Sequence, residues 1–198
     1  MKVLVTGGLG FIGSHTVVEL QSEGFEVVVV DNLSNSSEEV LEGIVAISGK
    51  KPIFKKIDLR EKSAVQSFFK EHSDIVGVIH FAASKAVGES VENPLLYYEN
   101  NISALVYILQ ELQQKTEANF IFSSSCTVYG QAEKMPITED ASIQEAMSPY
   151  GNTKQIGEEI ITDVTKVTNL NAILLRYFNP IGAHPSAEIG ELPIGVPQ

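Results

Sequence analysis

The chain has 198 residues, of which 43% are hydrophobic and 8% aromatic, so it is long enough for one globular domain with a substantial core. Its 25 acidic and 14 basic residues give a net charge of −11 without a basic cluster, which argues against nucleic acid as a partner. One cysteine, Cys126, excludes an internal disulfide, and the N-terminal residues lack an export signal or a long apolar stretch, so we expect a soluble cytoplasmic protein that does not bind membranes.

Short apolar segments alternate with longer amphipathic ones along the chain. The short segments are rich in Val, Ile and Phe, and their continuous apolarity is typical of strands covered on both faces. They are residues 3–6, 27–31, 53–57, 76–82, 120–124 and 172–178. The segments between them favour helices: residues 105–112 carry a buried-helix spacing, and Ser36 to Glu39 has the pattern of a capping box. This alternation predicts an α/β fold, a doubly wound parallel sheet (Rossmann fold) with helices on both faces.

The first predicted strand is followed directly by the glycine-rich stretch TGGLGFIG. Gly7, Gly10 and Gly13 let the backbone turn tightly and approach a pyrophosphate, while the following helix directs free N–H groups at it. The second strand ends in Asp31, where a carboxylate can accept both hydroxyls of an adenosine ribose. That charge would repel a 2′-phosphate, and residues 31–36 contain no Arg or Lys to offset it, so the pattern predicts NAD rather than NADP. The alternative is a tight turn without a ligand.

The stretch SPYGNTK places a tyrosine and a lysine four positions apart. Ser148 fits a helix cap and Pro149 the first helical position, so Tyr150 and Lys154 should lie on one helix face. A free tyrosine has a pKa of about 10 and is a poor base at neutral pH. We expect the ammonium, the positive helix end and a nicotinamide to lower the pKa of Tyr150, which would suit alcohol oxidation beside NAD. Without a nucleotide-binding fold, Tyr-x-x-x-Lys would more simply be a solvated helix face.

Five stretches together resemble the extended short-chain dehydrogenase/reductase family, and within it the enzymes that epimerise UDP-glucose and UDP-galactose at C4. They are TGGLGFIGSH, HFAASKAVGES, FSSSCTVYG, SPYGNTK and LLRYFNPIGAHPS. The resemblance implies an isomerase of galactose metabolism that transiently oxidises C4 of a UDP-hexose with tightly bound NAD. It also implies a homodimer formed through the helices around residues 95–114 and 150–167.

The resemblance assigns roles to individual residues. Tyr150 would take the proton of the 4-hydroxyl, Ser125 would hydrogen-bond that hydroxyl, and Lys154 would hold the nicotinamide ribose. The family's cofactor contacts fall on Gly7, Gly10, Phe11, Ile12, Gly13, Asp31, Asn32, Leu33, Ser34, Asn35, Ser36, Asp58, Leu59, Phe81, Ala82, Ala83, Ser84, Lys85, Asn100, Ser123, Tyr150, Lys154 and Phe178. Its substrate contacts fall on Lys85, Ser125, Thr127, Tyr150 and Asn179. The histidines lack ligand spacing, so no metal site is expected.

The family continues beyond this length with a smaller domain over the sugar nucleotide. We therefore expect residues 1–179 to form the NAD-binding Rossmann domain and the Pro- and Gly-rich residues 180–198 to begin a truncated substrate-binding region, with the C-terminal domain largely absent. One alternative is a nucleotide-sugar 4,6-dehydratase, although Cys126 and Thr127 stand where that reaction needs an acid/base pair. The other is a module that binds NAD without turning over substrate.

Overall fold

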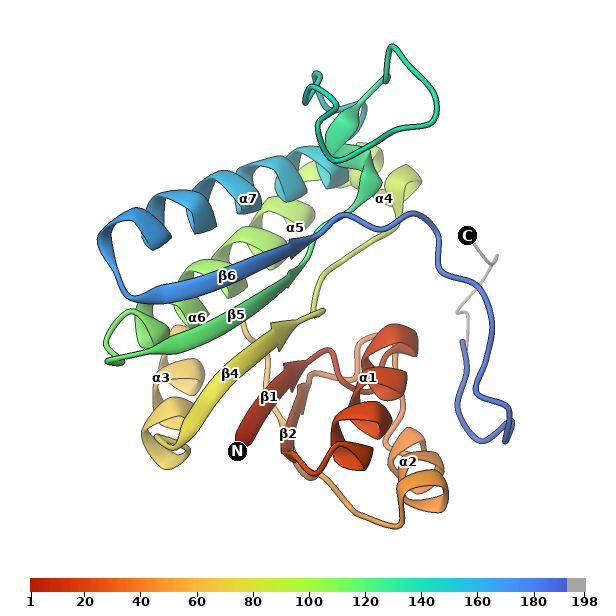
Figure 1. Cartoon of the computed structure of the whole chain (residues 1–198), viewed down its shortest axis with the longest axis vertical. Coiled ribbons are helices and arrows are strands. Elements are labelled where there is room, and N and C mark those ends of the chain that lie inside the picture. Colours follow the sequence, from red (N-terminus) through yellow and green to blue (C-terminus); the bar gives the residue numbers. More distant parts are fainter. Residues whose placement is uncertain (192–198) are drawn as a thin grey trace.

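Six parallel strands form one sheet in the computed structural model of the chain, which describes residues 1–191 (Figure 1). The strands are β1 (Lys2–Thr6), β2 (Glu26–Asp31), β3 (Ile53–Lys56), β4 (Ile75–His80), β5 (Ala118–Ser123) and β6 (Leu170–Leu175). Their order is β3-β2-β1-β4-β5-β6, and every neighbouring pair is parallel. The order reverses beside β1, and open α/β sheets bind their ligands at such a reversal, beyond the carboxyl ends of the strands. The predicted doubly wound parallel sheet is confirmed.

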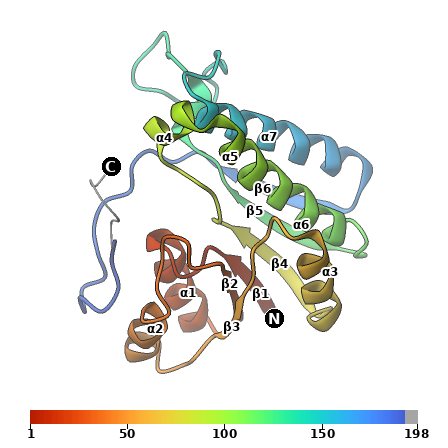
Figure 2. The ribbon, with the colours of Figure 1, turned by 180° about the vertical axis from the view of Figure 1, so that it is seen from behind.

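Helices cover both faces of this sheet (Figure 2). They are α1 (Phe11–Ser22), α2 (Val40–Ser48), α3 (Lys62–Glu71), α4 (Val87–Glu92), α5 (Pro94–Tyr98), α6 (Ala104–Leu112) and α7 (Pro149–Val167). A π-helical turn, η1 (Glu99–Ser103), joins α5 to α6, and a 3-10 turn, η2 (Cys126–Tyr129), follows β5. Helices α1 and α2 pack on one face, whereas α3, α6 and α7 pack on the other.

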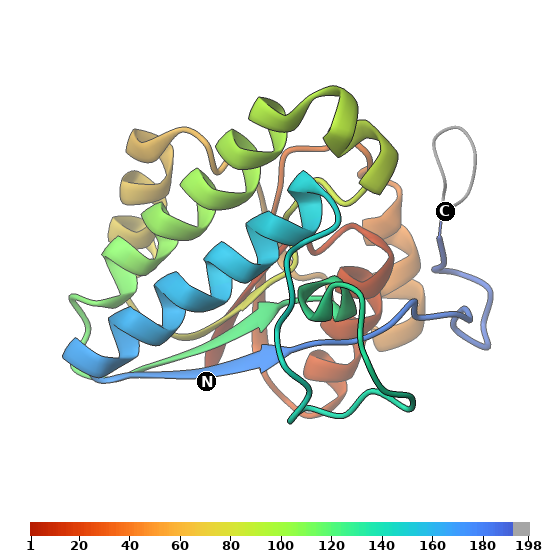
Figure 3. The ribbon, with the colours of Figure 1, turned by 90° about the horizontal axis from the view of Figure 1, so that it is seen from above.

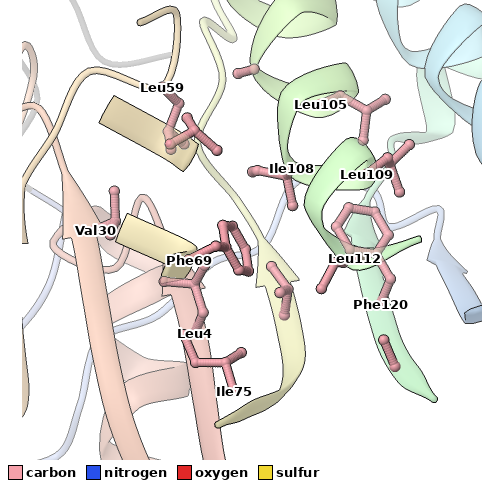
Figure 4. Packing of buried hydrophobic residues seen from close by; sticks show 14 of the residues in the cluster. Leu4, Val30, Leu59, Phe69, Ile75, Leu105, Ile108, Leu109, Leu112 and Phe120 are labelled. Atoms are coloured by element: carbon pink, nitrogen blue, oxygen red, sulfur yellow. The ribbon is translucent and has the colours of Figure 1, made fainter. Parts of the chain in front are cut away.

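The run of four valines in β2 shows why the strands are continuously apolar. Successive side chains of a strand point to opposite faces. Val28 and Val30 lie in the buried cluster beneath α3, α6 and α7. Val27 and Val29 lie in the cluster beneath α1 and α2. Figure 4 shows part of the first cluster, where the apolar side chains of α6 point toward the sheet, as the spacing of residues 105–112 predicts.

Two local predictions are wrong. Ser36 and Glu39 form no capping box: α2 begins at Val40, and the Ser36 hydroxyl donates to the carboxylate of Asp31 instead. The sixth strand ends at Leu175 rather than at residue 178. β6 is also an edge strand of the sheet, and the Ile173 side chain on it is 57% exposed to solvent. Its apolarity therefore does not reflect cover on both faces.

The chain beyond β6 runs past the carboxyl edge of the sheet to the side where α1 and α2 lie (Figure 3). Residues 176–191 form no helix or strand, but Ile189 is buried in the cluster with α2. Gly43 of α2 permits this contact, because a Cβ there would lie 2.3 Å from the Glu188 carbonyl oxygen. The boundary at residue 179 stays a prediction, and residues 192–198 lie outside the described part. Within residues 1–191, no helix is long and apolar enough to cross a membrane.

Candidate active site

The predicted site residues come from separate parts of the sequence and gather where the strands end. All six strands run in the same direction, so their carboxyl ends form one edge of the sheet. The glycine loop follows β1, Asp31 ends β2, and the segment beginning at Phe81 follows β4. Ser125 follows β5 directly. This edge is where open α/β sheets bind their ligands.

The glycine loop is shaped by close backbone contacts. Gly7 has φ of +65°, and a Cβ on it would lie 2.8 Å from the backbone nitrogen of Ala82. A Cβ on Gly13 would lie 2.2 Å from the Gly7 carbonyl oxygen. Gly10 caps α1 without a side-chain hydrogen bond, so no side chain of the cap occupies the amides of the first turn, where Phe11 and Ile12 lie. These residues fit a pyrophosphate held by backbone N–H groups.

The Asp31 carboxylate is buried beside this loop and organises it. It accepts hydrogen bonds from the Leu9 amide at 3.2 Å, the Leu33 amide at 2.9 Å and the Ser36 hydroxyl at 2.8 Å. A carboxylate offers about four acceptor positions, so capacity remains for a ribose hydroxyl. Residues 32–36, the remainder of the predicted ribose segment, form the irregular loop that follows.

The residues after β3 lie beside this loop, since the Ile57 amide donates to the Asp31 carbonyl oxygen. Asp58 is held by Arg60, whose Nη2 and Nε donate to its carboxylate at 2.6 and 3.0 Å. The Arg60 guanidinium lowers the pKa of Asp58. Leu59 has its side chain in the core, so any contact it makes with a cofactor would come from its backbone.

The loop after β4 is fixed by Asn101, a residue that the sequence reasoning missed. Its side chain bonds both the amide and the carbonyl of Ser84, at 2.9 and 3.0 Å, and donates to the Thr153 hydroxyl at 3.0 Å. The predicted Asn100 donates to the Ser84 hydroxyl at 3.1 Å. Both asparagines lie in the π-helical turn η1, a type of turn that is frequent at functional sites. Two adjacent asparagines within an apolar helical segment were the available signal.

Lys85 lies near the end of this loop and is exposed. Its ammonium pairs with Glu191 of the tail at 3.1 Å. The loop residues before it, Phe81 to Ala83, pass directly beside the glycine loop, and the Phe81 amide donates to the Thr6 carbonyl oxygen.

Ser125, Tyr150 and Lys154 lie close together in the structure. Ser148 caps α7 by accepting from the Gly151 amide at 3.1 Å, and Pro149 occupies the first turn, which confirms the predicted helix start. Lys154 is 3% exposed and its Nζ lies 5.7 Å from the centre of the Tyr150 ring. Ser125 caps the turn η2 and influences the ionisation of the Tyr150 phenol.

The charges of this cluster differ from expectation. Burial raises the pKa of Tyr150, and the neighbouring Ser125 hydroxyl opposes that shift without reversing it. Burial also lowers the pKa of Lys154 to about 8. The lysine ammonium donates to the Ser123 carbonyl oxygen at 2.7 Å rather than to the phenol. The protein's own groups therefore raise the pKa of Tyr150, because desolvation of the phenol outweighs the hydrogen bond from Ser125. The predicted lowering of this pKa also relies on a positive nicotinamide, so it stays a prediction.

Tyr177 is a second site residue that the sequence did not reveal. Its hydroxyl hydrogen-bonds the Ser123 hydroxyl, and its carbonyl accepts from the Cys126 amide at 3.0 Å. Thr127 has a buried hydroxyl with no hydrogen-bond partner within the described residues, so it retains capacity for a ligand.

Phe178 and Asn179 are not brought into this cluster. Both are exposed beyond the end of β6. Phe178 lines a groove of about 320 Å³ with Tyr129, Arg176 and residues 137–139. Their predicted contacts with nicotinamide and substrate stay predictions.

His80 lies beneath the site at the end of β4. It shares a 2.7 Å hydrogen bond with the Thr6 hydroxyl, and burial lowers its pKa to about 3. It is therefore neutral at physiological pH. Across residues 1–191, no group of three or more His, Cys, Asp or Glu side chains is placed to hold a metal ion.

The chain is similar to known epimerases in sequence. The family described as the NAD dependent epimerase/dehydratase family matches residues 3–192. The chain is 51% identical to UDP-glucose 4-epimerase uge1 of Schizosaccharomyces pombe over 98% of its own length, and 50% identical to UDP-glucose 4-epimerase of Bacillus subtilis over 100%. It spans 56% and 58% of the length of these two curated relatives.

Solved structures agree with this similarity. UDP-glucose-4-epimerase from Stenotrophomonas maltophila, with bound NAD and formylated UDP-arabinopyranose, superposes with a TM-score of 0.94 at 47% identity; the match covers 100% of this chain and 58% of that one. UDP-glucose 4-epimerase from Bifidobacterium longum, in complex with NAD+ and UDP, superposes with a TM-score of 0.95 at 43% identity; the match covers 100% and 59%.

Proposed function

Because the chain belongs to the NAD dependent epimerase/dehydratase family, we propose that it binds NAD and carries the reacting groups for interconversion of UDP-glucose and UDP-galactose. The observation that carries the proposal is the meeting of Ser125, Tyr150 and Lys154 at the sheet edge that also holds the glycine loop and Asp31. The names of relatives about half identical to the chain support the reaction. Cys126 and Thr127 after the serine disfavour the dehydratase alternative.

The fit of the loop to NAD rests on its backbone and on one carboxylate. The amides of Phe11 and Ile12 at the start of α1 would hold the pyrophosphate, and Asp31 would accept the adenosine ribose hydroxyls. The remaining contacts would come from the segments after β2, β3 and β4. When bound there, NAD would supply a reversible hydride acceptor for C4 of the sugar.

The proton of the 4-hydroxyl is assigned to Tyr150. Because burial raises the pKa of this phenol, it is neutral at physiological pH, and proton abstraction requires support for the phenolate as it forms. The Ser125 hydroxyl supplies part of that support by favouring the ionised form. Lys154 gives one of its three N–H donors to the Ser123 carbonyl, which leaves two for the nicotinamide ribose.

Further contacts belong to the same proposal. Lys85, Thr127 and Asn179 would meet the sugar diphosphate; the unpaired Thr127 hydroxyl and the exposed Lys85 ammonium leave both able to do so. A cytoplasmic location is consistent with the free thiol of Cys126.

We also propose a homodimer through the helices around residues 95–114 and 150–167, which include α5, α6 and α7. Val87, Val91 and Leu95 expose their side chains on α4 and α5, two elements that pack against α7. An exposed apolar group of this kind is typical of an interface between subunits.

The test is a single-turnover measurement of bound NAD reduction by UDP-galactose, followed through the absorbance of reduced nicotinamide. It uses both the 198-residue chain and the longest form of the protein that contains it. We expect Tyr150→Phe to slow reduction by about 10²- to 10⁴-fold, the contribution of a positioned base. Tyr107→Phe on α6 is the matched control and should reduce NAD at the rate of the unchanged protein. Retention of NAD with no reduction in either form would contradict the proposal and favour a non-catalytic module.

A further inference from the structure

Ser124, Glu158 and Arg176 meet beside the reacting groups, although none of them has a role in the chemistry described above. The Ser124 hydroxyl donates to Oε1 of Glu158. Arg176 donates to the same carboxylate from Nε at 2.9 Å and from Nη2 at 2.5 Å. Glu158 is 4% exposed, so a buried carboxylate is bonded at both oxygens by side chains from two other segments.

The positions of these residues connect the two halves of the candidate site. Ser124 directly precedes Ser125, and Glu158 lies one helical turn after Lys154 and two turns after Tyr150. Residues four apart on a helix share a face. The bond from Ser124 to Glu158 therefore joins the backbone beside Ser125 to the helix face that carries Tyr150 and Lys154.

Arg176 extends the connection to the far end of the turn η2. Its guanidinium lies 5.1 Å from the centre of the Tyr129 ring, and Nη1 approaches the Tyr129 hydroxyl at 3.4 Å. Tyr129 is the last residue of η2, whereas Ser125 caps its start. The turn is thus held at its beginning through Ser124 and at its end through Tyr129, with the Glu158–Arg176 pair common to both.

Stability alone explains this arrangement poorly. Removing two charges from water is costly, and apolar side chains of similar volume often stabilise a protein as well as a buried ion pair does. A buried charged pair has a different advantage: its hydrogen bonds are directional, so it accepts one geometry of the groups around it.

We propose that Glu158, together with Arg176, is a positioning residue that fixes the Ser125 turn against the Tyr150–Lys154 face of α7. Its effect on rate rests on the proposed function, whereas its effect on the turn does not. Neither side chain reacts with substrate. They act by keeping the Ser125 hydroxyl and the Tyr150 phenol at a fixed distance and orientation relative to each other.

Amide hydrogen exchange tests the turn without any catalytic reaction. The double variant Glu158→Leu/Arg176→Met removes both charges together, so neither is left buried and unpaired, and the control Glu159→Gln alters an exposed neighbour on α7. In the folded double variant, we expect the amides of Cys126, Val128 and Gly130 to exchange about tenfold faster or more, the factor expected for loss of one charge-assisted hydrogen bond. Unchanged exchange at these three amides would overturn the proposal. If the double variant does not fold, the nearly isosteric Glu158→Gln takes its place.

Single-turnover kinetics provides the second arm. We expect Glu158→Gln to slow NAD reduction by roughly 10- to 100-fold, because small misplacements of reacting groups are costly, while its affinity for NAD stays unchanged. Compared with Glu158→Gln, the double variant should have a higher melting temperature but an equally slow reduction of NAD. If the melting temperature and the rate both return to those of the unchanged protein, the role of Glu158 is purely structural and the positioning proposal is refuted. If the unchanged protein does not reduce NAD with UDP-galactose, the proposed function fails and the exchange result alone decides the role of Glu158.

Discussion

Burial of Lys154 should make the stability of the protein rise with pH through a range where most proteins change little. The side chain is 3% exposed, donates to the Ser123 carbonyl, and has its Nζ 5.0 Å from the centre of the Phe122 ring. This desolvated position lowers its pKa to about 8 in the folded protein. In the unfolded chain the lysine returns to an ordinary pKa of about 10.4.

The sign follows from the proton balance. Between the two pKa values the unfolded chain binds more protons than the folded protein, so the free energy of unfolding increases with pH. The penalty for the buried ammonium is complete below the folded pKa and fades as pH rises through it. Integrating between about pH 7.5 and about pH 9.5 gives an increase of about 2 kcal/mol in the free energy of unfolding.

Urea unfolding of the protein without added nucleotide, followed by circular dichroism at several pH values in this range, measures the increase. Lys154→Met should lack it. Lys166→Met should keep it, since Lys166 lies on the same helix but is exposed and paired with Asp163 on the surface. The range ends below about pH 10 because burial raises the pKa of Tyr150 and of Tyr177, and ionisation of tyrosine in the unfolded chain then favours unfolding. Parallel slopes for Lys154→Met and the unchanged protein would refute the reasoning.

Three other perturbations test separate parts of the structure. Asp31→Asn should weaken NAD binding by about 10- to 100-fold, as expected for loss of a charged acceptor, and reduce the ratio of NAD affinity to NADP affinity in calorimetric titrations. An unchanged affinity ratio would contradict the placement of Asp31 at the ribose. Gly43→Ala should displace the tail from α2 and lower the free energy of unfolding by about 1 to 2 kcal/mol. This is the loss from exposing one buried apolar side chain, less the gain in helix propensity. The control Gly88→Ala has open space around it and should not destabilise the protein. Leu95→Ser should shift the protein toward monomer by about tenfold in dissociation constant, and sedimentation showing an unaltered species would argue against α5 at the interface.

Local signals in the sequence were sufficient to predict the parallel sheet and the turns and helix starts beside the candidate site. The glycine spacing predicted a tight turn between the first strand and α1, and the Ser-Pro pair predicted the start of α7; both are confirmed. The contact of Asp31 with a ribose stays a prediction. Such signals work because the relevant interactions span a few residues: a cap, a tight turn, or a strand buried on both faces. The predicted capping box at Ser36 is wrong because the Ser36 hydroxyl donates to the buried Asp31 carboxylate, a stronger acceptor than the cap would offer.

The edge position of β6 lay beyond such signals. Its apolar run resembles that of β2, and strand order, which leaves β6 without a neighbour on one side, is a property of the tertiary structure alone.

The fold class follows from the sequence alone, and the sequence also predicts the glycine loop as a nucleotide site and Ser125, Tyr150 and Lys154 as reacting groups. The environment of those groups is set by tertiary structure. The pKa of Tyr150 depends on how deeply the phenol is buried, and the hydrogen bond between Ser124 and Glu158 joins residues 34 positions apart. Thr6 and His80 are 74 residues apart and share a hydrogen bond. Desolvation and long-range hydrogen bonds arise when distant segments pack together, so no window of sequence contains them.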